Sequence, residues 1–209
     1  MAGEDRDAEK AAADAATIAF YDTNAAGYAA AASCSEGFDH LERFMADLPA
    51  GASVLDFGCG DGWAAGRLAA EGFDVIGMDA SEGLLALAGA RPGVRVRRAF
   101  FEALDDRAAF DGVWASFSLL HAPRAALPAH IARIARALRP RGRLYLGLKE
   151  GTGERRDALG RLYSYFEPEE VTEHLTAAGF EAPPVERVPG TGMANDCTHY
   201  LHFHTRRAA

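Results

Sequence analysis

The chain has 209 residues, of which 49% are hydrophobic and 25% charged, and its formal net charge is -8 at pH 7. These values are ordinary for one globular domain, and an acidic chain is a poor binder of phosphate backbones, which are gripped by clustered Lys and Arg. The three cysteines form no CxxC pair, and neither a signal peptide nor an apolar run of membrane-spanning length is present. We therefore expect a cytoplasmic protein, a monomer or homodimer, that binds neither nucleic acid nor membrane.

Two helices are predicted within the first fifty residues. Residues 8–32 are rich in Ala, and the Thr23-Asn24 pair together with Gly27 predicts a break in this helix. The second helix is predicted from apolar residues at helical spacing, namely Phe38, Leu41, Phe44, Met45 and Leu48. A Pro-Ala-Gly sequence then ends this part, so we divide the chain into residues 1–50 and a domain over residues 51–209.

From residue 53 onward, short apolar runs alternate with helical patterns. Such alternation favours a parallel sheet with helices on both faces, because each crossover needs a helix to return the chain. Two final strands around a loop rich in Pro and Gly indicate an antiparallel edge. The predicted fold is α/β, a three-layer sandwich around a mostly parallel seven-stranded sheet with an antiparallel C-terminal edge strand. The predicted strands are 54–57, 73–78, 94–98, 110–115, 143–148, 180–188 and 198–205, and the predicted helices are 61–71, 81–90, 123–138 and 167–178.

The segment VLDFGCGDGW, residues 54–63, carries the strongest functional signal. Gly58 and Gly60 permit a tight turn between strand and helix and keep Cβ atoms out of the path of a ligand. Asp79 ends the next strand, about 20 residues later, where a carboxylate can accept hydrogen bonds from ribose hydroxyls. Glycines alone can serve a turn with no ligand, but Asp79 and the topology favour a nucleotide-like ligand.

Two details distinguish a dinucleotide from an adenosyl ligand. The spacing is Gly58-x-Gly60-x-Gly62, and Gly66 lies too far along to complete a GxGxxG fingerprint. Asp56 precedes the glycines, where its carboxylate would repel a pyrophosphate but can receive an ammonium group. S-adenosylmethionine carries an ammonium group and no phosphate, so we expect S-adenosylmethionine to be the cofactor.

Over residues 53 to 205 the chain resembles the class I (Rossmann-like) S-adenosylmethionine-dependent methyltransferases of the small-molecule type. The most specific parts are VLDFGCGDG with GMDAS, FDGVWASFSLLH, ALRPRGRLYLGLKEG and EPEEVTEHLTAAGFE. The resemblance implies methyl transfer to a small-molecule acceptor by in-line displacement, with residues 1–50 as a helical lid over the cofactor. It implies that the cofactor is bound by Tyr21, Tyr28, Asp56, Gly58, Cys59, Gly60, Asp79, Ala80 and Ser116.

The chain departs from the family pattern where adenine is expected to bind. Members often have an Asp in the loop after the third strand, and the corresponding residue here is Phe100. We therefore expect Phe100 or Phe101 to hold adenine through an aromatic contact, together with backbone hydrogen bonds. Either ring can instead belong to the core.

The resemblance also implies an acceptor pocket beyond the carboxyl ends of the fourth and fifth strands. Its candidate residues are His121, Lys149, Arg161 and Tyr163. His121 is the candidate general base, since an imidazole titrates near neutral pH, and the alternative role is a polar cap on the following helix. Alternatives also stay open for Lys149, which can pair with Glu150 or a neighbouring carboxylate, and for Arg161, which can solvate the surface. Tyr163 can anchor the lid.

The C-terminal strand carries His202 and His204 on one face, with no carboxylate or thiolate nearby in sequence. We therefore predict no metal site.

Three other functions remain open. An NAD-dependent oxidoreductase is disfavoured by Asp56 and by the glycine spacing, and a macromolecular methyltransferase is disfavoured by the acidic charge. A non-catalytic protein that binds S-adenosylmethionine or S-adenosylhomocysteine shares the same first motif, so the sequence does not separate it from an enzyme.

Overall fold

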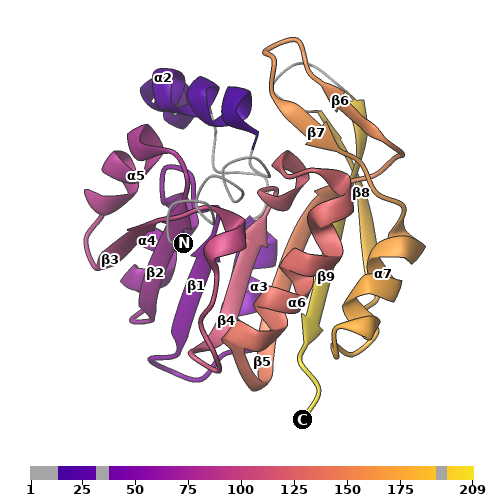
Figure 1. The fold of residues 1–209 in the computed structure, drawn as a ribbon. Coiled ribbons are helices and arrows are strands. Elements are labelled where there is room, and N and C mark those ends of the chain that lie inside the picture. Colours follow the sequence, from indigo (N-terminus) through magenta and orange to yellow (C-terminus); the bar gives the residue numbers. More distant parts are fainter. Residues whose placement is uncertain (1–13, 32–37, 192–196) are drawn as a thin grey trace, which may run out of the picture.

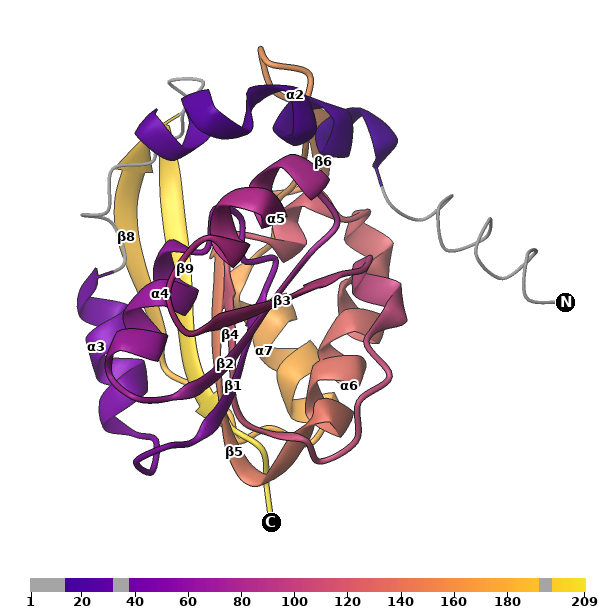
Figure 2. The same cartoon turned by 90° about the vertical axis from the view of Figure 1, so that its left-hand side faces the viewer.

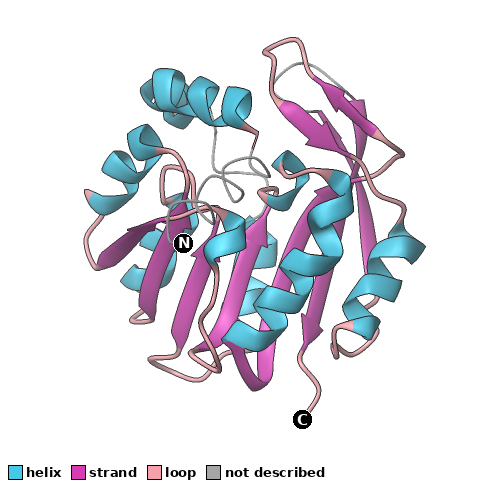
Figure 3. Ribbon diagram, in the orientation of Figure 1, coloured by secondary structure: helices cyan, strands magenta, loops and turns pink. Residues whose placement is uncertain are grey.

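The computed structural model describes residues 14–31, 38–191 and 197–209. One sheet with the strand order β3-β2-β1-β4-β5-β9-β8 runs through the molecule, and helices cover both of its faces (Figures 1, 2 and 3). This architecture confirms the predicted three-layer α/β fold. The strands are β1 (Ser53–Phe57), β2 (Asp74–Asp79), β3 (Val94–Arg98), β4 (Phe110–Ser116), β5 (Leu138–Lys149), β8 (Val185–Thr191) and β9 (Cys197–Arg206).

Strands β1 to β5 pair in parallel, and β9 runs antiparallel to its neighbours β5 and β8. Strand β5 begins earlier than predicted, because Leu138 already pairs with Phe110 of β4. Strand β8 begins later than predicted, at Val185, since two consecutive prolines precede it and proline has no N–H to donate to a ladder. The antiparallel pair at the C-terminal side of the sheet therefore agrees with the sequence, apart from these bounds.

The helices of the described chain follow the predicted positions closely. The predicted helix over residues 123–138 is divided, because a short 3-10 turn at Arg124–Ala126 precedes the α-helix. Asn24 has non-helical angles (φ -112°, ψ 15°), which confirms the predicted break in the first helix. The helices are α2 (Ala15–Ala31), α3 (Phe38–Ala46), α4 (Trp63–Ala70), α5 (Glu82–Gly89), α6 (Leu127–Ala137) and α7 (Pro168–Ala177).

The hydrophobic core lies on both faces of the sheet. Successive strand residues point to opposite faces, so Val54 packs with α3 and α4 while Leu55 and Phe57 pack with α6 and α7. Figure 2 shows these two pairs of helices on opposite sides of the strands. The second N-terminal helix, α3, thus packs in the core through Leu41 and Phe44 and lies away from α2.

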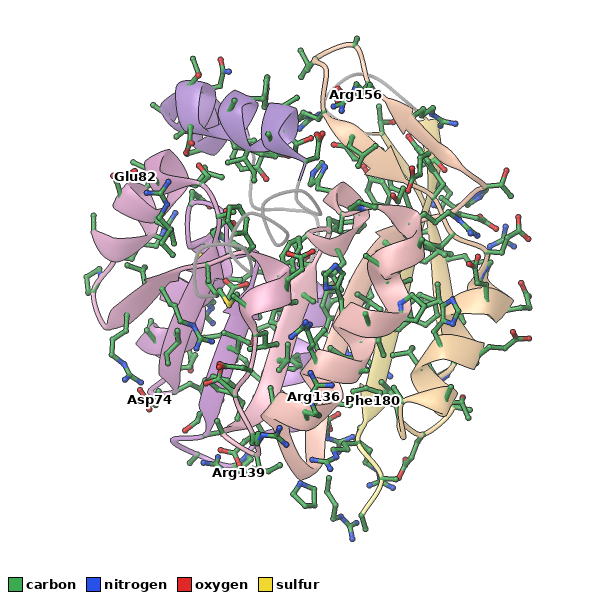
Figure 4. The ribbon with its side chains drawn as sticks, in the orientation of Figure 1. Asp74, Glu82, Arg136, Arg139, Arg156 and Phe180 are labelled. Atoms are coloured by element: carbon green, nitrogen blue, oxygen red, sulfur yellow. The ribbon has the colours of Figure 1, made fainter. Side chains whose placement is uncertain are left out.

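Two segments stand at the end of the molecule where the parallel strands terminate. Helix α2 crosses this end, and a two-stranded hairpin, β6 (Glu154–Arg156) with β7 (Leu162–Ser164), rises beside it (Figure 1). The sequence does not predict this hairpin, because its strands of three residues each are too short for a periodic pattern. Figure 4 shows Arg156 on the hairpin at this end, and Arg139 and Phe180 near the opposite end.

None of the helices within the described ranges combines the length and the apolar character that a membrane span requires.

Candidate active site

A cavity of about 500 Å³ lies at the carboxyl ends of the parallel strands, next to α2. Every residue that the sequence analysis proposed for the site lines this cavity, although the residues come from segments far apart in the chain. Their individual roles are proposals developed below. These residues are Tyr21, Tyr28, Asp56, Gly58, Cys59, Gly60, Asp79, Ala80, Phe100, Phe101, Ser116, His121, Lys149, Arg161 and Tyr163.

The glycine-rich turn has three glycines at positive φ, namely Gly58 (77°), Gly60 (55°) and Gly62 (76°). A Cβ atom on Gly58 would lie 2.2 Å from the Cβ of Ser118, and one on Gly62 would collide with α5 at 2.7 Å. A Cβ on Gly60 would meet nothing nearer than the ring of Tyr28, at 3.9 Å, and would project into free space. Gly58 and Gly62 are therefore required by packing, and Gly60 is the glycine that leaves room for a ligand.

The carboxylate of Asp79 is held between the glycine-rich turn and α5. Its Oδ2 accepts a hydrogen bond from the Gly60 amide (2.9 Å), and its Oδ1 accepts one from the Ser81 amide (2.9 Å). Burial raises the pKa of Asp79 above its ordinary value. Because carboxylate oxygens can accept more than one hydrogen bond each, Asp79 retains acceptor capacity toward the cavity for ribose hydroxyls.

Asp56 lies deeper in the same cavity and is only 3% exposed. Its Oδ2 accepts a hydrogen bond from the Ala65 amide (3.1 Å), and burial raises the pKa of the carboxyl group to about 8. A buried carboxylate of this kind is stabilised in its ionised form by a positive charge brought next to it. The residues present thus fit the ammonium group of S-adenosylmethionine.

An acid that the sequence analysis missed lies at the expected adenine end. Glu102 lines the cavity beside Phe100 and Phe101, and its Oε1 lies 3.5 Å from Nε2 of the buried His130. Phe101 packs against Phe57, with the ring centroids 4.9 Å apart, so it belongs to the core as well as to the cavity. Position 100 has no acidic group, and an acidic group lines the cavity two residues later in the chain. That short offset is the signal that could have revealed it.

Hydrogen bonds join His121 to the lid helix and to the hairpin. Its Nδ1 lies 2.7 Å from the carbonyl oxygen of Leu162, so Nδ1 carries the proton and Nε2 is an acceptor. The hydroxyl of Tyr21 lies 2.9 Å from Nε2, and Nη1 of Arg161 donates to the same hydroxyl (3.0 Å). Burial lowers the pKa of His121 to about 4, so the ring is neutral at pH 7. His121 does not cap a helix.

Arg161 is an interior cation and not a surface residue, since it is 1% exposed. Its Nε and Nη2 donate to Oδ2 of Asp157 at 2.9 and 2.6 Å. The guanidinium carbon lies 5.7 Å from the ring centroid of Tyr21 and 5.2 Å from that of Tyr163. Two hydrogen bonds to the Asp157 carboxylate and contacts with two aromatic rings thus fix the guanidinium at the cavity wall.

Lys149 ends β5 and is 4% exposed. Its Nζ lies 4.3 Å from the centroid of the Tyr163 ring. The neighbouring Glu150 instead accepts hydrogen bonds from Arg187 and lies 3.2 Å from Nδ1 of His199. The alternative in which Lys149 forms an exposed pair with Glu150 is therefore wrong, since consecutive residues of a strand point to opposite faces.

Helix α2 is held over the site near its middle and just before its start. Near the middle of the helix, Oδ1 of Asp22 accepts hydrogen bonds from the hydroxyl of Ser81 (2.7 Å) and the amide of Gly83 (3.1 Å). Just before its first residue, Asp14 accepts two hydrogen bonds from Arg156 (3.0 and 2.7 Å), and this partner lowers the pKa of Asp14 to about 2. These contacts hold Tyr21 and Tyr28 against the cavity, as expected for lid residues.

The C-terminal histidines lie elsewhere, on the face of the sheet that α3 covers. His40 stacks on His202 with ring centroids 3.9 Å apart, and its Nδ1 lies 3.1 Å from Nε2 of His204. Nδ1 of His202 lies 2.8 Å from the hydroxyl of Tyr145. Within the described ranges, no group of three or more His, Cys, Asp or Glu side chains has an arrangement that could hold a metal ion.

Comparison with known proteins gives the class of this fold and site. A family model described as a methyltransferase domain matches residues 54–142. A search of curated proteins finds no match. Among solved structures, the chain is similar to the 1,6-didemethyltoxoflavin-N1-methyltransferase of Burkholderia thailandensis, solved with 1,6-didemethyltoxoflavin and S-adenosylhomocysteine. The two share 28% identity over 93% of this chain and 88% of that chain, with a TM-score of 0.77.

Two more distant structures show the same fold. An S-adenosylmethionine-dependent methyltransferase from Mesorhizobium loti is 22% identical over 83% of this chain and 99% of that chain, with a TM-score of 0.67. The cyclase SpnF is 21% identical over 82% of this chain and 80% of that chain, with a TM-score of 0.63. Fold and first motif together place the present chain among enzymes that use S-adenosylmethionine. The methyltransferase domain matched over residues 54–142 and the fold indicate a class I S-adenosylmethionine-dependent methyltransferase.

Proposed function

We propose that this methyltransferase methylates a small molecule bound in the same cavity as its cofactor. The observation that carries the proposal is the burial of the acceptor end, where Lys149, Arg161 and Tyr163 are exposed by only 4, 1 and 6%. A protein or RNA chain would have to insert a segment beneath α2 to reach these side chains. The similar enzyme from Burkholderia thailandensis is named for a small-molecule substrate, which supports the same conclusion.

The cofactor end is proposed to bind S-adenosylmethionine through groups that match its parts. When bound, S-adenosylmethionine supplies an electrophilic methyl group on a positively charged sulfur. Asp56 is assigned to the ammonium group and Asp79 to the ribose hydroxyls, since both carboxylates line the cavity, where Asp56 is buried and Asp79 is half-buried. Glu102, with Phe101 beside it, is assigned to the adenine amino group. These residues orient the cofactor and exclude water, which are the main contributions of a protein to a displacement reaction.

His121 is proposed to take the proton of an acceptor that must lose one. The carbonyl of Leu162 fixes its tautomer, so the lone pair of Nε2 faces the hydroxyl of Tyr21. An acceptor proton can pass to Nε2 through that hydroxyl, because Tyr21 can receive one proton while it donates its own. Arg161, which donates to the Tyr21 oxygen, keeps the hydroxyl hydrogen directed at His121.

Two variants separate proton transfer from orientation. Tyr21→Phe keeps the ring that lines the cavity and removes the relay hydroxyl, and His121→Gln removes the base. General-base assistance is worth on the order of 10²-fold or more in rate, so we expect each variant to lower kcat by about that factor. The affinity for S-adenosylhomocysteine in His121→Gln should stay within about 3-fold of the parent. An unchanged kcat in His121→Gln would show that the acceptor loses its proton without this base.

The function itself is tested by transfer of a labelled methyl group. The protein is incubated with S-adenosylmethionine labelled in the methyl group and a panel of small acceptors, with a protein extract and total RNA as macromolecular arms. We expect label to appear in a small molecule, and Asp79→Ala should abolish the signal at limiting cofactor. Label that enters only protein or RNA would overturn the small-molecule assignment. Tight binding of S-adenosylhomocysteine without transfer to any arm would instead favour the non-catalytic binding protein.

A further inference from the structure

Helix α6 buries a histidine beneath the proposed adenine end of the cavity. The buried face of this helix carries His130 among the apolar residues Leu127, Ile131 and Ile134. His130 is only 1% exposed, and its ring meets that of Phe101 edge to face, with the centroids 5.6 Å apart. Phe101 lines the cavity, whereas His130 lies outside the lining. The imidazole therefore lies directly behind a side chain that faces the cavity.

The fold does not use the polar atoms of this histidine. Within the part of the chain that the structure describes, neither Nδ1 nor Nε2 of His130 makes a hydrogen bond. A buried polar group left without such a bond costs about 1–3 kcal/mol, and an apolar side chain at this position would avoid that cost. Burial lowers the pKa of His130 to about 4, so the ring is neutral at pH 7 and keeps one N–H. A polar group placed at this cost calls for an explanation other than packing.

Glu102 is the acidic side chain next to this imidazole. Its Oε1 lies 3.5 Å from Nε2 of His130, and its side chain lines the cavity and is 14% exposed. This distance is longer than that of a normal N–H···O bond, and a small rotation of the carboxylate brings it into range. A carboxylate opposite Nε2 favours the tautomer with the proton on Nε2, because the other tautomer sets a lone pair against a negative charge. His130 is thus placed to donate one hydrogen bond to Glu102.

We propose that His130 is a positioning residue whose Nε2–H directs the carboxylate of Glu102 toward the amino group of adenine. This inference rests on the proposed function, in which Glu102 binds that amino group, and it adds a residue that selects adenine over other purine bases. A glutamate side chain can adopt many rotamers, and Glu102 belongs to a single short turn, Phe101–Ala103. A donor fixed in α6 favours the rotamer that faces the ligand, which lowers the entropy lost on binding.

Binding of S-adenosylhomocysteine and of S-inosylhomocysteine, measured by isothermal titration calorimetry, tests this inference. The inosyl compound has an oxygen in place of the amino group, so it offers a carboxylate no N–H at that position. His130→Phe keeps an aromatic ring against Phe101 and removes the N–H. We expect this variant to bind S-adenosylhomocysteine about 5-fold more weakly than the parent, the effect of one hydrogen bond, and S-inosylhomocysteine within about 2-fold of the parent.

Three further variants separate positioning from packing. His130→Gln carries an N–H near the place of Nε2 and should restore the affinity for S-adenosylhomocysteine to within about 2-fold of the parent. In a Glu102→Gln background, His130→Phe should change this affinity by less than about 2-fold, because the carboxylate through which it acts is absent. The control His174→Phe removes a histidine of α7 that lies 3.7 Å from Glu170, outside the cavity lining, and should change the affinity for neither ligand.

The tautomer of His130 gives a measurement that needs no substitution. Heteronuclear NMR of the imidazole nitrogens, recorded on the parent protein with S-adenosylhomocysteine bound, shows which nitrogen carries the proton. We expect the proton on Nε2. A proton on Nδ1 overturns the inference, whether or not the variants fold.

The outcomes distinguish this inference from the function it rests on. Equal losses for the two ligands in His130→Phe, no loss for either, or no recovery in His130→Gln overturns the role of His130, while Glu102→Gln still weakens S-adenosylhomocysteine alone. If Glu102→Gln changes neither affinity, the adenine assignment of Glu102 fails, and the inference fails with it. Failure of S-adenosylhomocysteine to bind the parent protein overturns the cofactor assignment itself.

Discussion

Asp56 couples the stability of the protein to pH and to its cofactor, and Asp56→Asn exposes that coupling. Asparagine keeps the size of the side chain and an oxygen that can accept from the Ala65 amide, but it does not titrate. In the parent protein, burial raises the pKa of Asp56 from 3.8 to about 8. The folded protein therefore keeps a proton on Asp56 in a pH range where the unfolded chain has already released it.

The sign and size of the effect follow from this difference in pKa. The stabilising contribution of the raised pKa is complete below about pH 4 and is lost as the pH rises to about 8. One proton changes the free energy of unfolding by about 1.4 kcal/mol per pH unit, so the full loss amounts to about 6 kcal/mol at most. The asparagine variant does not suffer this loss.

Urea unfolding of both proteins across about pH 5 to pH 8 measures the effect, and the difference between them cancels the other titrating groups. We expect the free energy of unfolding of Asp56→Asn to rise relative to that of the parent by up to about 1.4 kcal/mol per pH unit as the pH increases through this range. Saturating S-adenosylhomocysteine should remove most of that slope, because its ammonium group lets Asp56 ionise in the folded state. A difference that does not change with pH, or that changes in the opposite direction, would refute the reasoning.

Three further changes probe the cofactor end. Asp79→Asn removes the charge that strengthens hydrogen bonds to ribose, so calorimetry should find S-adenosylhomocysteine bound 10- to 100-fold more weakly, a loss of about 1–3 kcal/mol; unchanged affinity contradicts the ribose assignment. Glu102→Gln should weaken the binding of ligands that contain adenosine by about 10-fold and leave the binding of a purine without the amino group unchanged. An equal loss of affinity for both ligands contradicts the adenine assignment. Gly58→Ala combines a positive φ with a Cβ placed 2.2 Å from Ser118 and should lower the free energy of unfolding by about 3 kcal/mol. The control Gly72→Ala, with positive φ but no atom within 4 Å, should cost only about 1 kcal/mol in the same urea experiment.

The sequence by itself determined the fold class and the part of the cavity wall that the glycine-rich turn, Asp56 and Asp79 build, whereas Glu102 was not predicted. Those features are local, because a strand, a turn and a helix follow one another within residues 53–70, and the positive φ angles of the turn admit little besides glycine. Asp79 could be added because a parallel sheet places the end of the next strand beside the turn, where it accepts a hydrogen bond from Gly60. The local sequence pattern therefore suffices to predict this part of the cavity wall.

Only the tertiary structure decided how the acceptor end is built. The bond from Tyr21 to His121 joins residues 100 positions apart, and the bond from Arg161 to Tyr21 joins residues 140 positions apart. No periodicity or spacing encodes such contacts, since they depend on how α2 and the β6–β7 hairpin meet over the sheet. The sequence could equally assign Arg161 to the surface, but the same packing places it in the interior. This packing also places Nζ of Lys149 over the ring of Tyr163. The burial of these charged side chains depends on packing between strands and loops that are far apart in the chain. The charge of the cavity wall is therefore a property of the folded chain.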